Sequence, residues 1–260
     1  HIVPIRIHLC IKILNIYLGL YITQPKLLGQ EYAMNLLPFK STYKAKNAIN
    51  LKGQRALVIT TSYKTLDTIN ATTGTVTKKG KATGVYASEM TDPYYVFLDA
   101  GMDVDVASIK GGEIPIEKAS LKPIMRTEYD IRFLKDPVFQ NKAKRSLKID
   151  DIDFLDYDII FMAGGWGAAY DLAQSDVLSE KLTKAYAAKK VMGGVCHGPV
   201  GFVGAVKPDG SPLAKGVKMT AVTDRQVKQL GIKITPKHPE TELRNEGADF
   251  RFTSDRFVEF

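Results

Sequence analysis

The sequence is poor in cysteine and histidine. Of 260 residues only two are cysteines, Cys10 and Cys196, and four are histidines. Two cysteines in such different contexts do not build the disulfide framework of a small secreted domain, so Cys196 is expected to be a free thiol. Zinc needs three or four ligands in a set geometry, and the chain has no spaced Cys/His pair. We therefore expect no metal site.

Acidic residues are scarce in the N-terminal third, so the excess of basic residues is confined to that part of the chain. The formal net charge is +8, but residues 1–81 carry 12 Lys and Arg against only two acids, and the remainder carries 24 basic and 26 acidic residues. A balanced body argues against a surface that follows a phosphate backbone. We therefore expect no nucleic-acid partner.

A long uncharged apolar run is also missing. Residues 7–22 are mostly apolar, but only residues 13–22 lack a charge, whereas a membrane-spanning helix needs roughly 20 apolar residues. Residues 1–50 are thus expected to be an extension, either a membrane anchor or signal-like segment or an amphipathic, poorly ordered one. The expected location is cytoplasmic, with anchoring through this extension as the alternative.

Apolar runs and helical segments alternate through residues 51–260. Continuous apolar strands separated by helices indicate a parallel sheet covered on both faces. The chain is therefore expected to form an α/β three-layer sandwich with a mostly parallel central sheet of the flavodoxin-like type. Residues 111–151 are expected to be an insertion over the ligand crevice or at a sheet edge. Strands are predicted at residues 55–61, 104–108, 158–163, 190–195 and 217–222. Helices are predicted to end before Gly101, to begin at Ser175 or Asp176, and to span residues 199–206.

A cysteine stands where the strand at residues 190–195 must turn into a helix. The local sequence is Gly-Gly-Val-Cys-His-Gly-Pro, residues 193–199. Glycines on both sides permit the sharp turn of a nucleophile elbow, and the following helix N-terminus favours an anion. The Cys196 thiol is therefore expected to ionise more easily than a free one. The alternative is a buried structural cysteine in a glycine-rich turn.

Ligands of parallel sheets bind at the carboxyl ends of the strands. Thr60 and Thr61, Gly164 and Gly165, and Cys196 all follow predicted strands. These residues are expected to meet in one crevice.

Four segments together resemble a known family: TGVYASEMTDPYYVFLDAG (83–101), VDVAS (104–108), YDIIFMAGGWGAAYDL (157–172) and GGVCHGP (193–199). They are similar to the PfpI-like branch of the class I glutamine amidotransferase-like superfamily. Within it they most resemble the heat-shock glyoxalase, deglycase and chaperone group. Relatives usually continue past residue 250 into one more strand and a closing helix, so the domain is expected to lack these.

The resemblance assigns roles to matching residues. It implies Cys196 as nucleophile, His197 as catalytic histidine, and Glu89, in the loop after the first strand, as the acid that contacts the thiol. Asp224 is a candidate third member orienting His197, although an aspartate after a strand is also a common helix cap. Backbone amides of Gly165 and His197 are the expected oxyanion donors.

Two further positions line or neighbour the expected pocket. Gly164 and Trp166 are expected pocket residues, and Trp166 stands where several relatives have histidine, so it should narrow the pocket and favour small substrates. Sequence leaves two placements for His238, a surface loop before a helix or a loop over the site.

The expected function is a cysteine-dependent enzyme acting on a small reactive carbonyl, of the glutathione-independent glyoxalase or deglycase type, that turns methylglyoxal into lactate without a cofactor. A stress-related holdase chaperone or redox sensor is the alternative from another class. A peptidase or glutamine amidohydrolase fits less well. A homodimer is expected.

Overall fold

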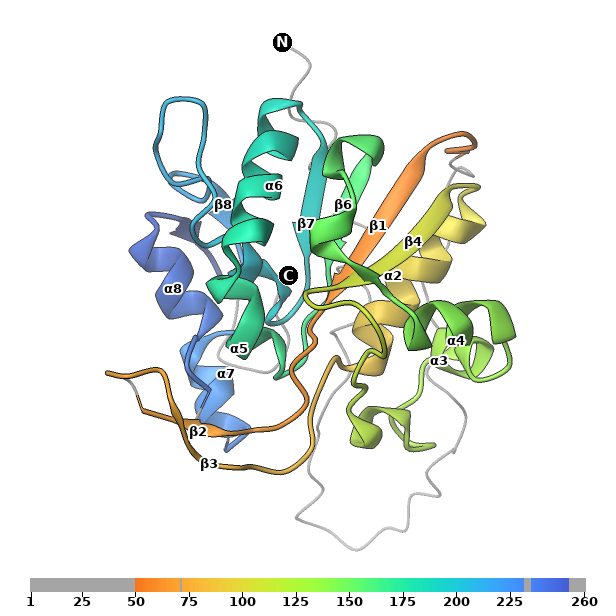
Figure 1. The fold of residues 1–260 in the computed structure, drawn as a ribbon, viewed down its shortest axis with the longest axis horizontal. Coiled ribbons are helices and arrows are strands. Elements are labelled where there is room, and N and C mark those ends of the chain that lie inside the picture. The colour runs from red at the N-terminus through yellow and green to blue at the C-terminus, as the bar shows by residue number, and fades with distance from the viewer. Residues whose placement is uncertain (1–49, 71, 232–234, 253–260) are drawn as a thin grey trace, which may run out of the picture.

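A five-stranded, fully parallel sheet forms the centre of the computed structural model, which describes residues 50–70, 72–231 and 235–252 (Figure 1). The spatial order is β5-β4-β1-β6-β7, and each neighbouring pair is parallel. The predicted mostly parallel α/β sheet is confirmed. The strands are β1 (Arg55–Thr60), β4 (Asp103–Ser108), β5 (Leu147–Lys148), β6 (Ile159–Met162) and β7 (Val191–Gly194).

Both faces of the sheet are buried, which explains why its central strands are continuously apolar. In β1, side chains from Ala56 to Thr60 are all buried, and all four residues of β6 are buried. Successive side chains of a strand point to opposite faces. Accordingly Leu57 and Ile59 join one apolar cluster, whereas Ala56 and Val58 join the other.

One face is covered by α2 and by the segment predicted to be an insertion. This segment lies at the β4 edge of the sheet, where β5 adds the last strand, and its α3 packs against α2. A complete capping box at Thr127 fixes the start of α3. The helices are α2 (Ala87–Asp99), η1 (Lys118–Leu121), α3 (Glu128–Phe133) and α4 (Pro137–Lys144).

The other face is covered mainly by α6, whose apolar side chains Leu178, Leu182 and Ala185 are buried. Ser175 caps α6 by accepting a hydrogen bond from the Leu178 amide, as predicted. The elements on this side are η2 (Ile149–Asp151), η3 (Phe154–Asp156), α5 (Ala168–Asp171), η4 (Leu172–Gln174), α6 (Asp176–Ala187) and η5 (Gly198–Phe202).

Two predicted elements differ in the structure. The helix predicted after the elbow is the five-residue 3₁₀ helix η5, because Pro199 and two glycines do not favour a longer α-helix. The strand predicted at residues 217–222 shortens to β8 (Lys218–Met219), which pairs with β9 (Asp249–Phe250) in a separate two-stranded sheet rather than joining the central one. Two short helices lie between these strands, α7 (Asp224–Gln229) and α8 (Pro239–Asn245).

A hairpin of β2 (Thr68–Ile69) and β3 (Val76–Lys78) extends from the loop after β1 (Figure 1). Asp67 anchors it, since its buried carboxylate accepts hydrogen bonds from Lys79, the Tyr63 hydroxyl and the Gly80 amide. Burial raises the pKa of Asp67, but these donors outweigh it and lower the pKa to about 2.

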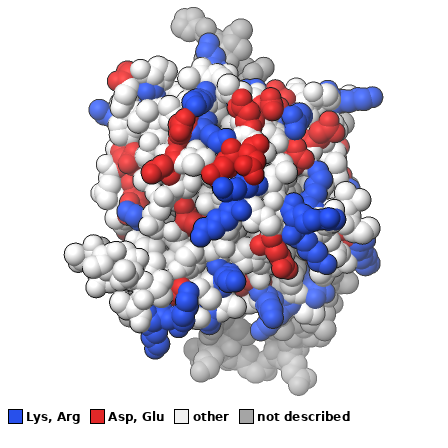
Figure 2. All heavy atoms as spheres, in the orientation of Figure 1, with Lys and Arg blue, Asp and Glu red and all other residues white. Residues whose placement is uncertain are grey.

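Within the described residues, no helix is long and apolar enough to cross a membrane. The predicted N-terminal extension lies almost wholly outside the described residues, as does the C-terminal tail. On the face shown in Figure 2, basic and acidic side chains are interspersed. That the protein binds no nucleic acid stays a prediction.

Candidate active site

Cys196 lies in a strained turn directly after β7. Its φ is +56°, a left-handed value that non-glycine residues seldom adopt. The turn is closed by a hydrogen bond of 2.7 Å from the Gly198 amide to the Val195 carbonyl. A Cβ on Gly198 would collide with the carbonyl of Met162 in β6, so this position requires glycine. The geometry is that of the predicted nucleophile elbow.

The loop after β6 lies against this turn. A Cβ on Gly164 would lie 2.7 Å from the His197 amide nitrogen and from the Val195 carbonyl oxygen, and it would collide with Oε2 of Glu89. Gly165 has φ +84° and fits against the backbone of residues 84–86. The ends of β6 and β7 thus meet at Cys196 as predicted, and glycine at 164 gives the Glu89 carboxyl room to approach.

The end of β1 lies against the loop after β6, since a Cβ on Gly167 would collide with Thr61. The buried carboxyl of Asp171 accepts hydrogen bonds of 2.8 Å from the Thr61 hydroxyl and the Ser62 amide. Burial raises the pKa of Asp171 to about 7, although these donors oppose the rise. The sequence alone does not single out Asp171. Its only signal was an acid four residues after the Gly-Trp-Gly turn, a spacing that does not reveal its partners.

Glu89 lies in the first turn of α2, not in a loop as predicted. Its Oε2 is buried and has no hydrogen-bond partner among the described residues. Burial raises the pKa of Glu89 to about 8, with Cys196 and the amides of Gly165 and Gly164 opposing part of the rise. At neutral pH the carboxyl is therefore mostly protonated and able to donate a hydrogen bond.

The Cys196 thiol does not become more acidic, contrary to the prediction. Burial raises its pKa well above the ordinary value, and the neighbouring Glu89 raises it further. The backbone amides of Gly165 and His197 act in the opposite direction by favouring the thiolate. The two amides predicted to be oxyanion donors thus lie close to the sulfur. A negative charge on this sulfur depends on the Glu89 carboxyl staying protonated, because an ionised Glu89 would repel it.

His197 is almost completely buried beside the sulfur. Its Nδ1 lies 3.4 Å from Sγ of Cys196. Burial, followed by the nearby His238, lowers the pKa of His197 to about 3, so the ring is neutral. The Trp166 ring lies 4.7 Å from the His197 ring, centroid to centroid, at a tilt of 51°. Trp166 is therefore a direct neighbour of His197, and that it lines a substrate pocket stays a prediction.

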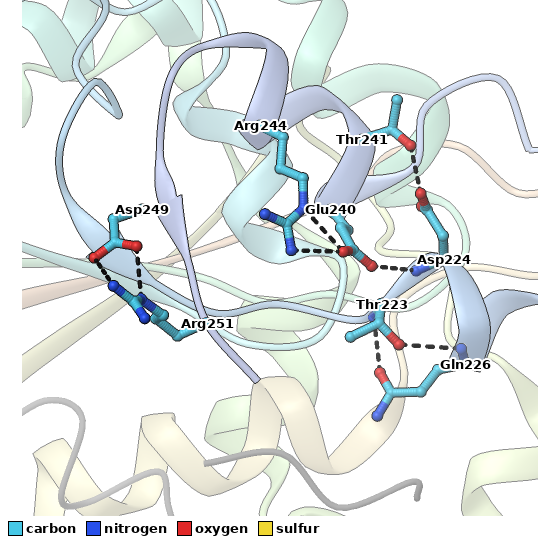
Figure 3. Close-up of polar contacts among 8 residues, drawn as sticks. All are labelled: Thr223, Asp224, Gln226, Glu240, Thr241, Arg244, Asp249 and Arg251. Atoms are coloured by element: carbon cyan, nitrogen blue, oxygen red, sulfur yellow. Dashed lines mark hydrogen bonds and ion pairs between the residues drawn. The ribbon is translucent and has the colours of Figure 1, made fainter. Parts of the chain in front are cut away.

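Asp224 is held by other partners than His197. Its Oδ2 accepts a 2.6 Å hydrogen bond from the Thr241 hydroxyl, and its amide donates to Oε2 of Glu240 (Figure 3). Its Oδ1 is buried and has no hydrogen-bond partner among the described residues. The helix cap of α7 is the preceding residue, Thr223. The structure shows no Asp224–His197 hydrogen bond, and Asp224 as a third catalytic member stays a prediction.

In the described part of the chain, no group of three or more His, Cys, Asp and Glu side chains could hold a metal ion. The cluster of Glu89, Cys196 and His197 instead combines a thiol, a neutral carboxyl and a neutral imidazole. Such a set can add the sulfur to a carbonyl carbon and move protons at the adjacent atoms.

Comparison with known proteins identifies relatives of this chain. The glutathione-independent glyoxalase hsp3101 of Schizosaccharomyces pombe is 31% identical over 187 residues, which cover 69% of this chain and 75% of that protein. The crystal structure of glyoxalase III from Candida albicans superposes with a TM-score of 0.66 at 28% identity, covering 77% of this chain and 83% of that one. The crystal structure of the Rapid Encystment Protein of Francisella tularensis superposes with a TM-score of 0.68 at 28% sequence identity, and the match covers 77% of this chain and 84% of that one. Residues 81–238 match the DJ-1/PfpI family model. The chain belongs to the DJ-1/PfpI family.

Proposed function

We propose that this protein is a cysteine-dependent, glutathione-independent glyoxalase that converts methylglyoxal and water into lactate. The observation that carries the proposal is the strained Cys196 with His197 Nδ1 at 3.4 Å and the buried Glu89 carboxyl beside it. The names of its relatives from S. pombe and C. albicans support the same activity. No step of the reaction requires a cofactor, because the thiol itself forms the covalent intermediate.

In the first step the sulfur of Cys196 attacks the aldehyde carbon. The thiol proton passes to Nδ1 of the neutral His197, which returns it to the aldehyde oxygen, and a hemithioacetal results. Backbone amides of Gly165 and His197 stabilise the charge that develops while the carbon–sulfur bond forms. The raised pKa of the Cys196 thiol disfavours a thiolate before substrate binds. The thiol therefore loses its proton to His197 only as it attacks the aldehyde.

In the second step a proton moves between the two carbons. His197 removes the hydrogen from the former aldehyde carbon while the protonated Glu89 gives its proton to the ketone oxygen, forming an enediol. His197 then protonates the former ketone carbon, and Glu89 recovers a proton from the other hydroxyl, leaving a lactyl thioester on Cys196. The pKa of about 8 suits Glu89 to act as both acid and base near neutral pH. Water then hydrolyses the thioester to lactate and the free thiol.

A direct assay tests this proposal. Purified protein incubated with methylglyoxal and no glutathione is expected to release lactate, and Cys196→Ala is expected to lower the rate by at least about 10³-fold. Equal lactate from the two proteins, or none from the wild type, would refute the glyoxalase. Suppression of protein aggregation that survives Cys196→Ala would instead favour the holdase alternative.

We further propose a cytoplasmic homodimer, on the basis of the family resemblance. Light scattering of the purified protein after gel filtration gives the oligomeric state directly. A monomeric mass would contradict the dimer.

A further inference from the structure

His197 has one ring nitrogen facing the Cys196 sulfur and one that finds no partner among the described residues. Nδ1 faces Sγ of Cys196, whereas Nε2, on the other side of the ring, is buried and makes no hydrogen bond within the described part of the chain. For Nδ1 to accept the thiol proton, the neutral ring must carry its own proton on Nε2. A buried N–H without an acceptor is destabilising, because it has lost its hydrogen bond to water. The base therefore needs an acceptor on its Nε2 side.

Asp224 does not supply this acceptor in the structure. One carboxylate oxygen accepts from Thr241, and the amide of Asp224 is bound to Glu240 (Figure 3). A carboxylate hydrogen-bonded to His197 would raise the pKa of that imidazole. The pKa of His197 is instead lowered, first by burial and then by His238.

His238 immediately precedes α8, on the side of the site that the central sheet does not supply. Two contacts tie this region to the elbow. The Val222 amide donates a 3.0 Å hydrogen bond to the Cys196 carbonyl, and two residues later the Asp224 amide donates to Glu240 in the first turn of α8. In addition, α8 packs against η5, which starts at the residue after His197.

The side chain of His238 has a matching unpaired atom. Its Nδ1 is buried and, among the described residues, has no hydrogen-bond partner. The imidazole does not cap α8. These two buried imidazole nitrogens each lack a hydrogen-bond partner among the described residues, and His238 is close enough to lower the pKa of His197. One bridging water can satisfy both nitrogens.

We propose that His238 is a positioning residue for His197: its Nδ1 accepts, through one bridging water, the hydrogen bond from Nε2–H of His197. This link holds the His197 ring in the tautomer whose Nδ1 can take the thiol proton of Cys196. The role of His238 in turnover rests on the proposed glyoxalase function, but the link itself does not. The other ionisable groups on the neighbouring elements are Glu89 and Cys196 on the sheet side, and Asp224, Glu240 and the Lys237–Glu242 ion pair on the α7–α8 side.

The tautomer of His197 tests the link without any assay of activity. Nitrogen-15 NMR of the histidine rings is expected to show His197 protonated on Nε2 in the wild type and in His238→Asn, because the Asn amide occupies nearly the place of Nδ1. In His238→Leu a mixture of tautomers is expected. Wild-type His197 protonated on Nδ1, or a spectrum unchanged in His238→Leu, would overturn the proposal.

Reactivity gives a second readout. Alkylation of Cys196 by iodoacetamide near neutral pH is expected to slow about tenfold in His238→Leu and to stay within about twofold of wild type in His238→Asn. Lys237→Gln, which removes a neighbouring charge but not Nδ1, is the control and should leave the rate unchanged. If methylglyoxal is a substrate, His238→Leu should lower kcat with little change in KM. A thermal melt shows whether His238→Leu folds. If it does not, the NMR tautomer of His197 in wild type and in His238→Asn decides whether the proposal stands.

Discussion

The sheet side and the C-terminal side of the site are built in different ways. On the sheet side, backbone geometry fixes the reacting atoms, through the left-handed Cys196 and the close approach of Gly164 and Gly198 to their neighbours. On the C-terminal side, α7 and α8 contribute side chains, and Asp224 and His238 each have a buried polar atom that lacks a partner among the described residues. The difference indicates that the parallel sheet fixes the backbone around Cys196, whereas the starts of α7 and α8 add only side chains beside it.

The largest effect is expected from Gly164→Ala, because the new Cβ would meet the Glu89 carboxyl, the His197 amide and the Val195 carbonyl at once. We expect methylglyoxal conversion to fall by about 10³-fold and the free energy of unfolding by about 2–4 kcal/mol. Gly210→Ala is the control, since a Cβ there meets nothing and only its φ of +78° is unfavourable. It should cost about 1 kcal/mol and leave activity intact. An active Gly164→Ala enzyme would contradict backbone control of the site.

Glu89→Gln is expected to lower kcat by about 10²-fold, because the amide cannot exchange a proton with the substrate. The same variant tests the raised pKa through stability. The folded pKa is about 8 and the ordinary value is 4.5, so the neutral Glu89 carboxyl makes its full contribution to the free energy of unfolding below about pH 4.5, and this contribution is lost as pH rises through about 8.

Denaturant unfolding as a function of pH checks this sign. Glu89→Gln should gain more than about 1 kcal/mol relative to wild type as pH rises through this range, and little at acid pH. A stability difference that does not change with pH would show that the Glu89 carboxyl is not held neutral.

Trp166→Ala tests whether the Trp166 ring limits the size of the substrate. Removing the ring that lies 4.7 Å from His197 should admit larger 2-oxoaldehydes. We expect the ratio of kcat/KM for phenylglyoxal to that for methylglyoxal to rise about tenfold. An unchanged ratio with both substrates would mean that Trp166 packs the core and does not limit the pocket.

Asp224→Asn is expected to have the smallest effect. The side chain can still accept from Thr241, so stability should change by less than about 1 kcal/mol and kcat by less than about threefold. A fall in kcat approaching 10⁴-fold, as for the aspartate of a catalytic triad, would instead give Asp224 the role that sequence analysis considered for it.

Much of the sheet side could be predicted from sequence. Continuous apolar runs identified β1, β4, β6 and β7, and the Gly-Gly-Val-Cys-His-Gly-Pro motif indicated the elbow. Both features depend on residues that are close in sequence, because the backbone conformation of a sharp turn is limited by the size of its own side chains. The length of η5 and the pairing of β8 could not be predicted, since they depend on tertiary contacts rather than on apolar pattern.

The electrostatics of the site were harder to predict. A cysteine at an elbow suggested an acidic thiol, but burial and Glu89 raise the pKa of Cys196. Sequence cannot show how much water a group loses on folding. The same holds for His238, whose two possible placements sequence left open, and for Asp171, whose partners lie about 110 residues away.

Infrared difference titration of wild type against Glu89→Gln tests most directly that a neutral carboxyl lies beside the sulfur. The wild type should show a protonated-carboxyl band at neutral pH that disappears with a midpoint near pH 8 and is missing from Glu89→Gln. A Glu89 carboxyl that ionises near the ordinary value of 4.5 would contradict both the proton shuttle and the placement of charge at Cys196.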